Sequence, residues 1–266
     1  MSITGHYITV NGVKTYYEEN ENVGKYHVVC IHIAGRESRQ YHEMMEYLNR
    51  RLHLLAIDMP AHGKSWPKAG CTPICNSTEY GDFVWDFIQA VGVEHPVVMG
   101  CSLGGNIVYE MAQRHPLEAI VSLQGADYTA VISPVSRAFM NHPYVSLQHS
   151  HLDYSHSLAG HALTQKAKDF ILWGVRQEIP PTKKADLTMY NGFDVREGMK
   201  DITCPCLVIR GEDDWIVDEE SVQATLSRIT NSRKLVFRHI PGVGHYPAVE
   251  SPLVLSNMVE EFLNNL

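Results

Sequence analysis

The chain has 266 residues, a net charge of -8 at neutral pH and a sequence pI near 6.0. This acidic balance argues against nucleic acid or an anionic membrane surface as the main partner. A hydrophobic share of 44% is ordinary for a globular protein and excludes a disordered chain. No apolar run reaches the length of a membrane span, and the N-terminus lacks the basic start and apolar core of a signal peptide. We therefore expect a cytoplasmic protein.

The N-terminal segment predicts a β-hairpin. Residues His6–Val10 and Val13–Glu18 alternate between apolar and polar side chains on either side of Asn11-Gly12. An Asn-Gly pair between two alternating segments is the strongest short hairpin signal.

After the hairpin, short apolar runs alternate with amphipathic helical patterns. The expected buried strands are residues 26–32, 52–57, 97–99, 119–123, 206–210 and 234–240. The expected helices lie around 41–48, from an N-cap at Ser77 or Thr78 to Val91, and at 106–114, 219–229 and 252–266. This alternation predicts an α/β fold with a mostly parallel, doubly wound sheet and helices on both faces.

Residues 128–190 interrupt this pattern. They contain helical fragments such as Leu163–Trp173 and many His, Ser and Pro residues, but no apolar run of strand type. Their place in the chain is that of a lid over a site, and the alternative is an additional helical hairpin without a role in binding. We predict a core domain of residues 1–127 and 191–266 and a helical cap insert of residues 128–190.

The cysteines and histidines give little sign of a metal. Four cysteines lie in or beside apolar strand-like runs, where a cysteine is usually a small buried hydrophobic residue: Cys30, Cys101, Cys204 and Cys206. Cys71 and Cys75 lie in a loop, but no second pair at metal spacing accompanies them. A histidine cluster in the insert has no zinc spacing: His142, His149, His151, His156 and His161. We expect neither a metal nor a cofactor.

The segment Gly100-Cys101-Ser102-Leu103-Gly104 has the pattern G-x-S-x-G and lies between a strand and a helix. Such a corner exposes the serine hydroxyl above the sheet, and Gly100 and Gly104 leave room where a Cβ would collide with neighbouring backbone. The first amides of the helix stabilise negative charge at the same point. We predict that Ser102 is a nucleophile.

A serine nucleophile needs a base, and the base needs an acid to hold it. Asp213 and Asp214 follow the strand 206–210, and His245 follows the strand that ends at Ile240. Side chains that follow parallel strands gather at one edge of the sheet, so the pattern predicts that these residues meet Ser102 there.

Together these motifs resemble the α/β-hydrolase family along nearly the whole chain. The matching segments are 32–35, 58–65, 100–105, 211–214 and 242–247. The order Ser102, Asp214, His245 is the order of α/β-hydrolases. The resemblance implies the α/β-hydrolase fold and selects Asp214 over Asp213, because the family's carboxylate commonly stands three residues after the glycine. Asp127 occupies an occasional alternative position for the acid.

The resemblance also implies an oxyanion hole formed by the backbone N–H groups of Leu103 and Ala34. The family usually has glycine directly after the histidine of this loop. This chain has Ile33 instead, so its loop departs from the family pattern at the position before Ala34. His32 is expected to fix the loop rather than to act as a base.

Candidate substrate-binding residues are Ile33, Arg36, Cys101 and Trp173. An arginine on this loop either holds a substrate carboxylate or forms a surface salt bridge. Four aromatic residues are candidates for an apolar lid lining, with an ordinary place in a helix core as the alternative: Phe139, Tyr144, Trp173 and Trp215.

By resemblance, a serine nucleophile excludes the dehalogenase and epoxide-hydrolase branches, which use a carboxylate. The predicted function is hydrolysis of a small, partly apolar carboxylic ester or lactone through an acyl-enzyme, by a monomer or homodimer with a small-molecule substrate. The first alternative is a C–C bond hydrolase of ring-fission diketones, whose members commonly have asparagine at the position of Cys101. A receptor-like binding protein with little turnover is the alternative of another class, and a cofactor-free oxygenase or an acyltransferase is a smaller possibility.

Overall fold

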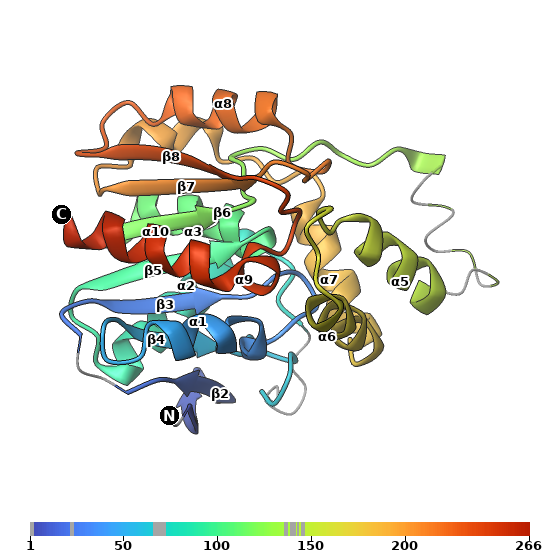
Figure 1. Ribbon diagram of the computed structural model, residues 1–266, viewed down its shortest axis with the longest axis horizontal. Coiled ribbons are helices and arrows are strands. Elements are labelled where there is room, and N and C mark those ends of the chain that lie inside the picture. The colour runs from blue at the N-terminus through green and yellow to red at the C-terminus, as the bar shows by residue number, and fades with distance from the viewer. Residues whose placement is uncertain are drawn as a thin grey trace.

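A single eight-stranded sheet organises the chain (Figure 1), and its strand order is β1-β2-β4-β3-β5-β6-β7-β8. The computed structural model describes residues 3–21, 24–65, 73–135, 138, 142, 144 and 147–266. The strands are β1 (Thr4–Val10), β2 (Val13–Glu19), β3 (His27–Ile31), β4 (His53–Ile57), β5 (Pro96–Cys101), β6 (Ala119–Leu123), β7 (Cys206–Gly211) and β8 (Leu235–Ile240).

The helices of the core are α1 (His42–Tyr47), α2 (Ser77–Val91), α3 (Leu103–Arg114), α8 (Glu219–Arg228), α9 (Pro247–Glu250) and α10 (Pro252–Asn264). Between β6 and β7, the described residues include α5 (Leu147–Ser157), α6 (Gln165–Arg176) and α7 (Pro180–Tyr190). Two short 3₁₀ helices span Ser38–Tyr41 and Arg196–Asp201.

The predicted hairpin is confirmed. Strands β1 and β2 pair antiparallel with Val10 opposite Val13. Asn11 and Gly12 form the turn with φ values of 50° and 79°, because a two-residue turn that matches the strand twist needs positive φ at both positions. Strand β2 is also antiparallel to β4, and the remaining neighbours are parallel.

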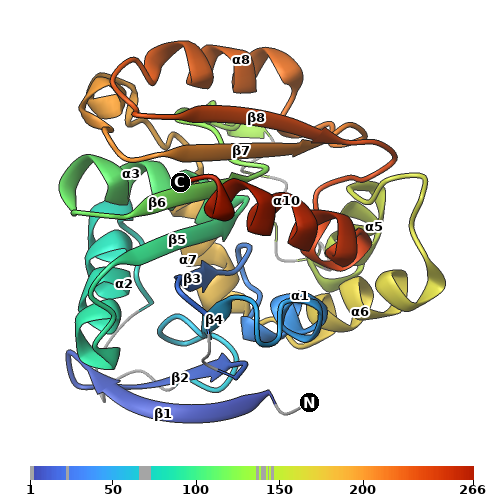
Figure 2. The same cartoon turned by 60° about the vertical axis from the view of Figure 1, so that its left-hand side comes forward.

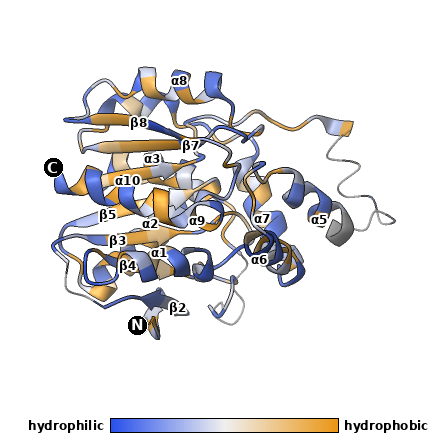
Figure 3. Cartoon of the chain, in the orientation of Figure 1, coloured by the Kyte–Doolittle hydropathy of each residue, from blue (hydrophilic) through white to orange (hydrophobic). Residues whose placement is uncertain are grey.

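The sheet separates two hydrophobic layers, because successive side chains of a strand point to opposite faces. On one face, Val29 and Ile31 pack in a cluster with residues of α2, α3 and α8. On the other, Val28 and Cys30 pack with residues of α1 and α10. Figure 2 shows these helices on either side of the strands, and Figure 3 shows the central strands as the most hydrophobic part of the chain. The prediction of a doubly wound sheet is therefore confirmed.

Two helix starts differ from the prediction. The N-cap of α2 is Asn76 rather than Ser77 or Thr78, and its Oδ1 accepts hydrogen bonds from the N–H groups of Thr78 (2.9 Å) and Glu79 (3.2 Å). Asparagine is an equally good capping residue, so the sequence pattern alone placed this start one residue late. Helix α3 begins at Leu103, because the turn at Ser102 leads directly into it.

The helices α5, α6 and α7 lie together beyond one end of the sheet (Figure 1). The predicted helix 163–173 corresponds to α6. Helix α7 was not predicted, although Pro180 at its first turn is a known helix-start signal. The segment that leaves the core after β6 lies beside the segment that returns to it. Tyr128 pairs with Asp194, and the N–H of Thr129 donates to the carbonyl of Phe193 (2.9 Å). The cap boundaries at 128 and 190 stay a prediction.

The four cysteines expected to be buried are buried: Cys30, Cys101, Cys204 and Cys206. Cys75 is exposed, and Cys71 lies outside the described residues. Among the helices described, none is long and apolar enough to cross a membrane.

Candidate active site

The turn at Ser102 joins β5 to α3 in an unusual backbone conformation. Ser102 has φ 56° and ψ -115°, which is costly for a residue with a side chain and is found where surrounding structure enforces it. Its N–H donates to the carbonyl of Leu123 (2.8 Å). A Cβ on Gly100 would lie 2.1 Å from the carbonyl oxygen of Gly104, and one on Gly104 would lie 2.6 Å from that of Ile31. Glycine is therefore required at both positions by close backbone contact.

The Ser102 hydroxyl is not used to cap the helix that follows it. Ser102 is the N-cap residue of α3, but its side chain forms no capping hydrogen bond. As the first residue of the helix, Leu103 has an N–H with no acceptor inside the helix. The positive end of the helix and this N–H thus lie next to the hydroxyl.

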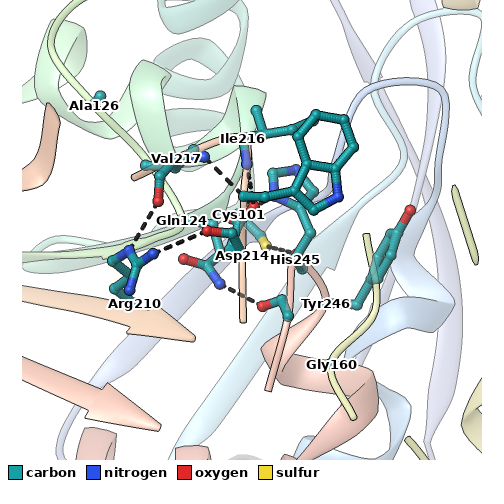
Figure 4. A network of polar contacts seen from close by, with 12 residues as sticks. Cys101, Gln124, Ala126, Gly160, Arg210, Asp214, Ile216, Val217, His245 and Tyr246 are labelled. Carbon is teal, nitrogen blue, oxygen red and sulfur yellow. Dashed lines mark hydrogen bonds and ion pairs between the residues drawn. The ribbon is translucent and has the colours of Figure 1, made fainter. Parts of the chain in front are cut away.

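His245 and Asp214 form a buried pair (Figure 4). Nδ1 of His245 lies 2.7 Å from Oδ2 of Asp214, and both side chains are almost fully buried. The other carboxylate oxygen of Asp214, Oδ1, accepts hydrogen bonds from the N–H groups of Ile216 (2.9 Å) and Val217 (3.4 Å). The orientation of the carboxylate is therefore set by the backbone, and it in turn orients the imidazole.

Arg210 holds the loop that carries Asp214. Its guanidinium donates to the carbonyl oxygens of Asp214 and Val217, each at 2.9 Å, as Figure 4 shows. Arg210 belongs to β7, so a side chain of the sheet fixes the loop that follows it.

The loop that carries His245 is held by Cys101, which precedes Ser102, and by Gln124, which follows β6. The thiol of Cys101 donates to the carbonyl of His245 (3.6 Å), and the amide of Gln124 donates to that of Gly244 (Figure 4). Burial raises the pKa of the Cys101 thiol well above its usual value, so the thiol keeps its proton. Because Cys101 directly precedes Ser102, this contact brings the backbone of His245 beside the serine turn.

Glu250, at the end of α9, also holds the loop that carries His245. Its carboxylate accepts hydrogen bonds from the N–H groups of Gly244 (3.0 Å), Tyr246 (2.9 Å) and Gly160 (2.7 Å). Burial raises the pKa of this carboxyl despite the three donors. Gly160 follows α5, so the residues around His245 are tied to the predicted cap.

The two other candidate acids have different partners. The carboxylate of Asp127 accepts from Arg228 (2.8 Å) and Thr225 (3.0 Å). Asp213 pairs with His161 (2.5 Å). Of the three carboxylates, Asp214 is the one that contacts His245.

In the described part of the chain, the loop after β3 leaves the backbone N–H of Ala34 without an acceptor. The N–H of Ile33 donates to Gln40 (3.1 Å), that of Gly35 to Asp186 (2.7 Å) and that of Arg36 to the carbonyl of Ile33 (3.0 Å). Within the described part of the chain, the N–H of Ala34 donates to no acceptor. Ala34 thus has a backbone donor to offer.

His32 fixes this loop, as the sequence analysis expects. Its Nδ1 lies 2.9 Å from the carbonyl oxygen of Ile33, and its Nε2 accepts from the N–H of Met59 (3.2 Å). Burial, together with the neighbouring His62, lowers the pKa of His32 to about 3, which keeps the ring neutral. A neutral ring with both nitrogens engaged is a structural link between the loops after β3 and β4.

Three of the candidate substrate contacts line one small cavity. Ile33, Arg36 and Trp173 surround a space of about 20 Å³ between the loop after β3 and α6, which has room for about one water molecule. The guanidinium of Arg36 is already engaged: it donates to the carbonyl of Ile171 (3.0 Å) and lies 3.5 Å from the carboxylate of Glu178. The salt bridge considered for Arg36 is therefore present, but it is buried rather than on the surface.

The remaining candidate contacts are placed differently. Cys101 is fully buried behind the loop of His245. Trp215 is 56% exposed and donates to the carbonyl of Ser157 (2.9 Å), and Tyr144 is 92% exposed. Phe139 lies outside the described residues. Among the residues the structure describes, no group of three or more His, Cys, Asp or Glu side chains is arranged to hold a metal ion.

The sequence patterns did not predict the residues that hold the loops in place: Arg210, Gln124, Glu250, Asp186 and Lys183, whose Nζ donates to the carbonyl of Ala34. A charged residue within a buried strand, such as Arg210, is a signal that could have been used, because a buried charge needs partners. The others lie in segments whose neighbours in space are far away in the chain.

Comparisons with known proteins agree with this geometry. A family model described as alpha/beta hydrolase fold matches residues 26–144. An uncharacterized hydrolase of Bacillus subtilis (strain 168) is 23% identical over 96% of this chain and 96% of its own. The 2-hydroxy-6-oxo-6-(2'-aminophenyl)hexa-2,4-dienoic acid hydrolase of Metapseudomonas resinovorans is 24% identical over 97% of this chain and 90% of its own. The crystal structure of the enol-lactonase from Burkholderia xenovorans LB400 superposes with a TM-score of 0.83 at 18% identity, over 97% of this chain and 100% of that one. The chain has the α/β-hydrolase fold, and the proteins it is similar to include hydrolases of that superfamily.

Proposed function

We propose that the protein is a serine hydrolase that cleaves small, partly apolar carboxylic esters or lactones through an acyl-enzyme. Ser102 attacks the carbonyl carbon, and His245 takes the hydroxyl proton and passes it to the leaving alcohol. Asp214 keeps the imidazole in the tautomer with a proton on Nδ1 and stabilises its cation. Water then repeats the cycle on the acyl-enzyme and releases the acid.

One observation carries this proposal. Ser102 lies in a strained turn whose preceding residue contacts the backbone of His245, and His245 is 2.7 Å from a buried carboxylate. A nucleophile, a base and an orienting acid on three separate loops are the parts that acyl transfer needs. A glycine would adopt this conformation at lower cost, so a serine at this position favours a role for its hydroxyl.

The proposed oxyanion hole consists of the N–H groups of Leu103 and Ala34. It is supported by the first-turn position of Leu103 and by the absence of an acceptor for Ala34 N–H within the described residues. Two preorganised donors at this point stabilise the charge that develops on the carbonyl oxygen. In this proposal, residues 128–190 form the cap that covers the site.

The substrate class rests on the chemistry of these parts and on the relatives. A lactone is an internal ester, and the enol-lactonase of Burkholderia xenovorans has the same fold. The Metapseudomonas relative acts on a hydroxy-oxo-dienoic acid, which favours the C–C hydrolase as the second candidate. Cys101 in place of the asparagine common in that branch keeps the ester or lactone first.

A substrate panel tests the proposal. Wild type and Ser102→Ala are compared on p-nitrophenyl esters of short acids, lactones, thioesters and ring-fission diketones, with both proteins checked for folding by circular dichroism. We expect wild type to turn over esters or lactones fastest and Ser102→Ala to lose this activity. Full activity in the variant would contradict the mechanism. Preferred cleavage of the diketones would select the C–C hydrolase, and tight binding without turnover would select the receptor-like alternative.

A further inference from the structure

Two side chains of α7 hold a single peptide unit of the loop after β3. Nζ of Lys183 donates to the carbonyl oxygen of Ala34 (2.9 Å), and the N–H of Gly35 donates to Oδ2 of Asp186 (2.7 Å). These two groups are the two ends of the peptide bond between Ala34 and Gly35. Lys183 and Asp186 are three residues apart and therefore lie on the same face of the helix.

The approach of α7 is possible because residue 35 is glycine. Gly35 has φ +73°, and a Cβ at this position would lie 2.5 Å from Cδ of Lys183. The stem of Lys183 thus packs directly over the Cα of Gly35. A larger residue would push the lysine away from the loop.

Asp186 is anchored on its other side. Its side chain is fully buried, and its Oδ2 lies 2.8 Å from Nε2 of His62, whose Nδ1 lies 3.0 Å from the carbonyl oxygen of Pro60. The imidazole raises the stability of the carboxylate form, and the Asp186 pKa is held below its usual value by His62 and by the N–H of Gly35. Asp186 therefore joins α7 to the loops after β3 and β4 as a charged acceptor.

Lys183 is anchored as well. Its ammonium lies 3.0 Å from the carboxylate of Glu178, and that carboxylate also meets Arg36 (3.5 Å) and His151 (3.6 Å). A partly buried charge in such a network has little freedom to move, because moving the ammonium away from Glu178 weakens its pairing. The donor to Ala34 is thus held at a fixed point.

These contacts set the direction of the Ala34 N–H. The peptide before Ala34 is held at its oxygen by the N–H of Arg36 (3.0 Å) and by His32 (2.9 Å). The peptide after Ala34 is held at both ends by α7. With both flanking peptides fixed, the N–H of Ala34 can point in one direction only.

We propose that Lys183 and Asp186 are positioning residues of the oxyanion hole, so that α7 sets the rate of acyl transfer and not only access to the site. This inference rests on the proposed function, in which Ala34 N–H stabilises the oxyanion. It predicts that the loss of either contact weakens binding of the transition state more than binding of the ester. Neither residue touches the substrate in this proposal.

The test compares Lys183→Met, Lys183→Arg and Asp186→Asn with wild type and with Lys184→Met. Methionine keeps the apolar stem of Lys183 and removes the donor, whereas arginine keeps a charged donor. Lys184 is the next residue of the same helix and is exposed, which makes it a matched control. Each protein is measured for kcat and KM on the best ester of the panel, for the inhibition constant of a trifluoromethyl ketone of the same acyl group, and for its melting temperature.

We expect kcat of Lys183→Met to fall by about 10- to 100-fold, somewhat less than the roughly 10²- to 10³-fold loss on removal of an oxyanion donor itself. KM should change little, and the inhibition constant of the ketone, which forms an oxyanion on Ser102, should rise in parallel with the loss of kcat. Asp186→Asn should show the same split, Lys183→Arg should recover much of kcat, and Lys184→Met should match wild type.

Two results would overturn the inference. The first is unchanged kcat in folded Lys183→Met and Asp186→Asn while Ser102→Ala is inactive, which leaves the proposed function intact. The second is an equal rise of KM and of the ketone's inhibition constant with kcat unchanged, which would make α7 a binding element only. If Lys183→Met does not fold, Asp186→Asn and Lys183→Arg carry the same comparison. If wild type itself is inactive, the proposed function is overturned instead. Hydrogen exchange of the backbone amides of residues 33–37 then still tests whether α7 holds the loop, because their exchange should be faster in Asp186→Asn.

Discussion

The replacement Asp214→Asn tests the proposed base and its acid together. In wild type, Oδ1 of Asp214 accepts two backbone N–H groups, from Ile216 and Val217, and Oδ2 faces Nδ1 of His245. An asparagine in the same place has one oxygen and one NH₂ group. The backbone donors select the oxygen for the Oδ1 position, which turns the NH₂ group toward the imidazole.

The expected loss of kcat follows from this orientation of the amide. The opposite orientation of the amide gives up two hydrogen bonds of about 1 kcal/mol each, so it is disfavoured by roughly thirtyfold. With NH₂ facing it, Nδ1 of His245 must accept, and the proton of the neutral ring moves to the Nε2 side, where the base should accept the proton of Ser102. We expect kcat to fall by about 10⁴-fold, the loss known for the same change in a serine protease triad.

The assay is release of p-nitrophenol from a short-chain ester, with the folded state checked by the melting temperature. Two aspartates provide controls. Asp213→Asn removes an exposed pair with His161 and should leave kcat nearly unchanged. Asp127→Asn weakens the partly buried pair with Arg228 and should lower the melting temperature while most of kcat remains. The reasoning is refuted if Asp214→Asn keeps most of its activity, or if Asp127→Asn loses far more kcat than Asp214→Asn does.

Two further predictions concern stability. Gly100→Ala places a Cβ 2.1 Å from the carbonyl oxygen of Gly104; we expect a large loss of stability in urea unfolding, and a variant as stable as wild type would show that the turn can relax. Burial raises the pKa of Glu110 from 4.5 to about 7, although Arg114 pairs with it. Between these pH values the folded state binds a proton that the unfolded state has lost, so the free energy of unfolding falls as pH rises from 4.5 to about 7. Above about pH 7, Glu110 causes no further change in stability with pH. The melting temperature of Glu110→Gln relative to wild type should therefore increase over this pH window, and a pH-independent difference between the two proteins would contradict the shift.

Much of the fold could be predicted from the sequence because its signals are local. The hairpin follows from Asn11-Gly12 between alternating segments, and the buried parallel strands follow from unbroken apolar runs of strand length. The serine turn is also local, since the need for glycine at 100 and 104 arises within five residues of the chain.

The identity of the acid and the role of Arg36 could not be predicted in the same way. Asp127, Asp213 and Asp214 all follow strands at the same edge, and they are distinguished by partners such as Arg228 and His161 that come from distant segments. Arg36 has the same appearance in sequence whether it faces a substrate or Glu178.

The sequence by itself thus determined the sheet, the serine turn and the order of the candidate catalytic residues, because periodicity, turn chemistry and strand ends are properties of short segments. The tertiary structure alone decided how the loops around them are held. Helix α7 reaches the loop after β3 across about 150 residues of chain, with Lys183 on Ala34 and Asp186 on Gly35. Such contacts depend on where the packing of the whole chain places a helix, and no short segment carries that information.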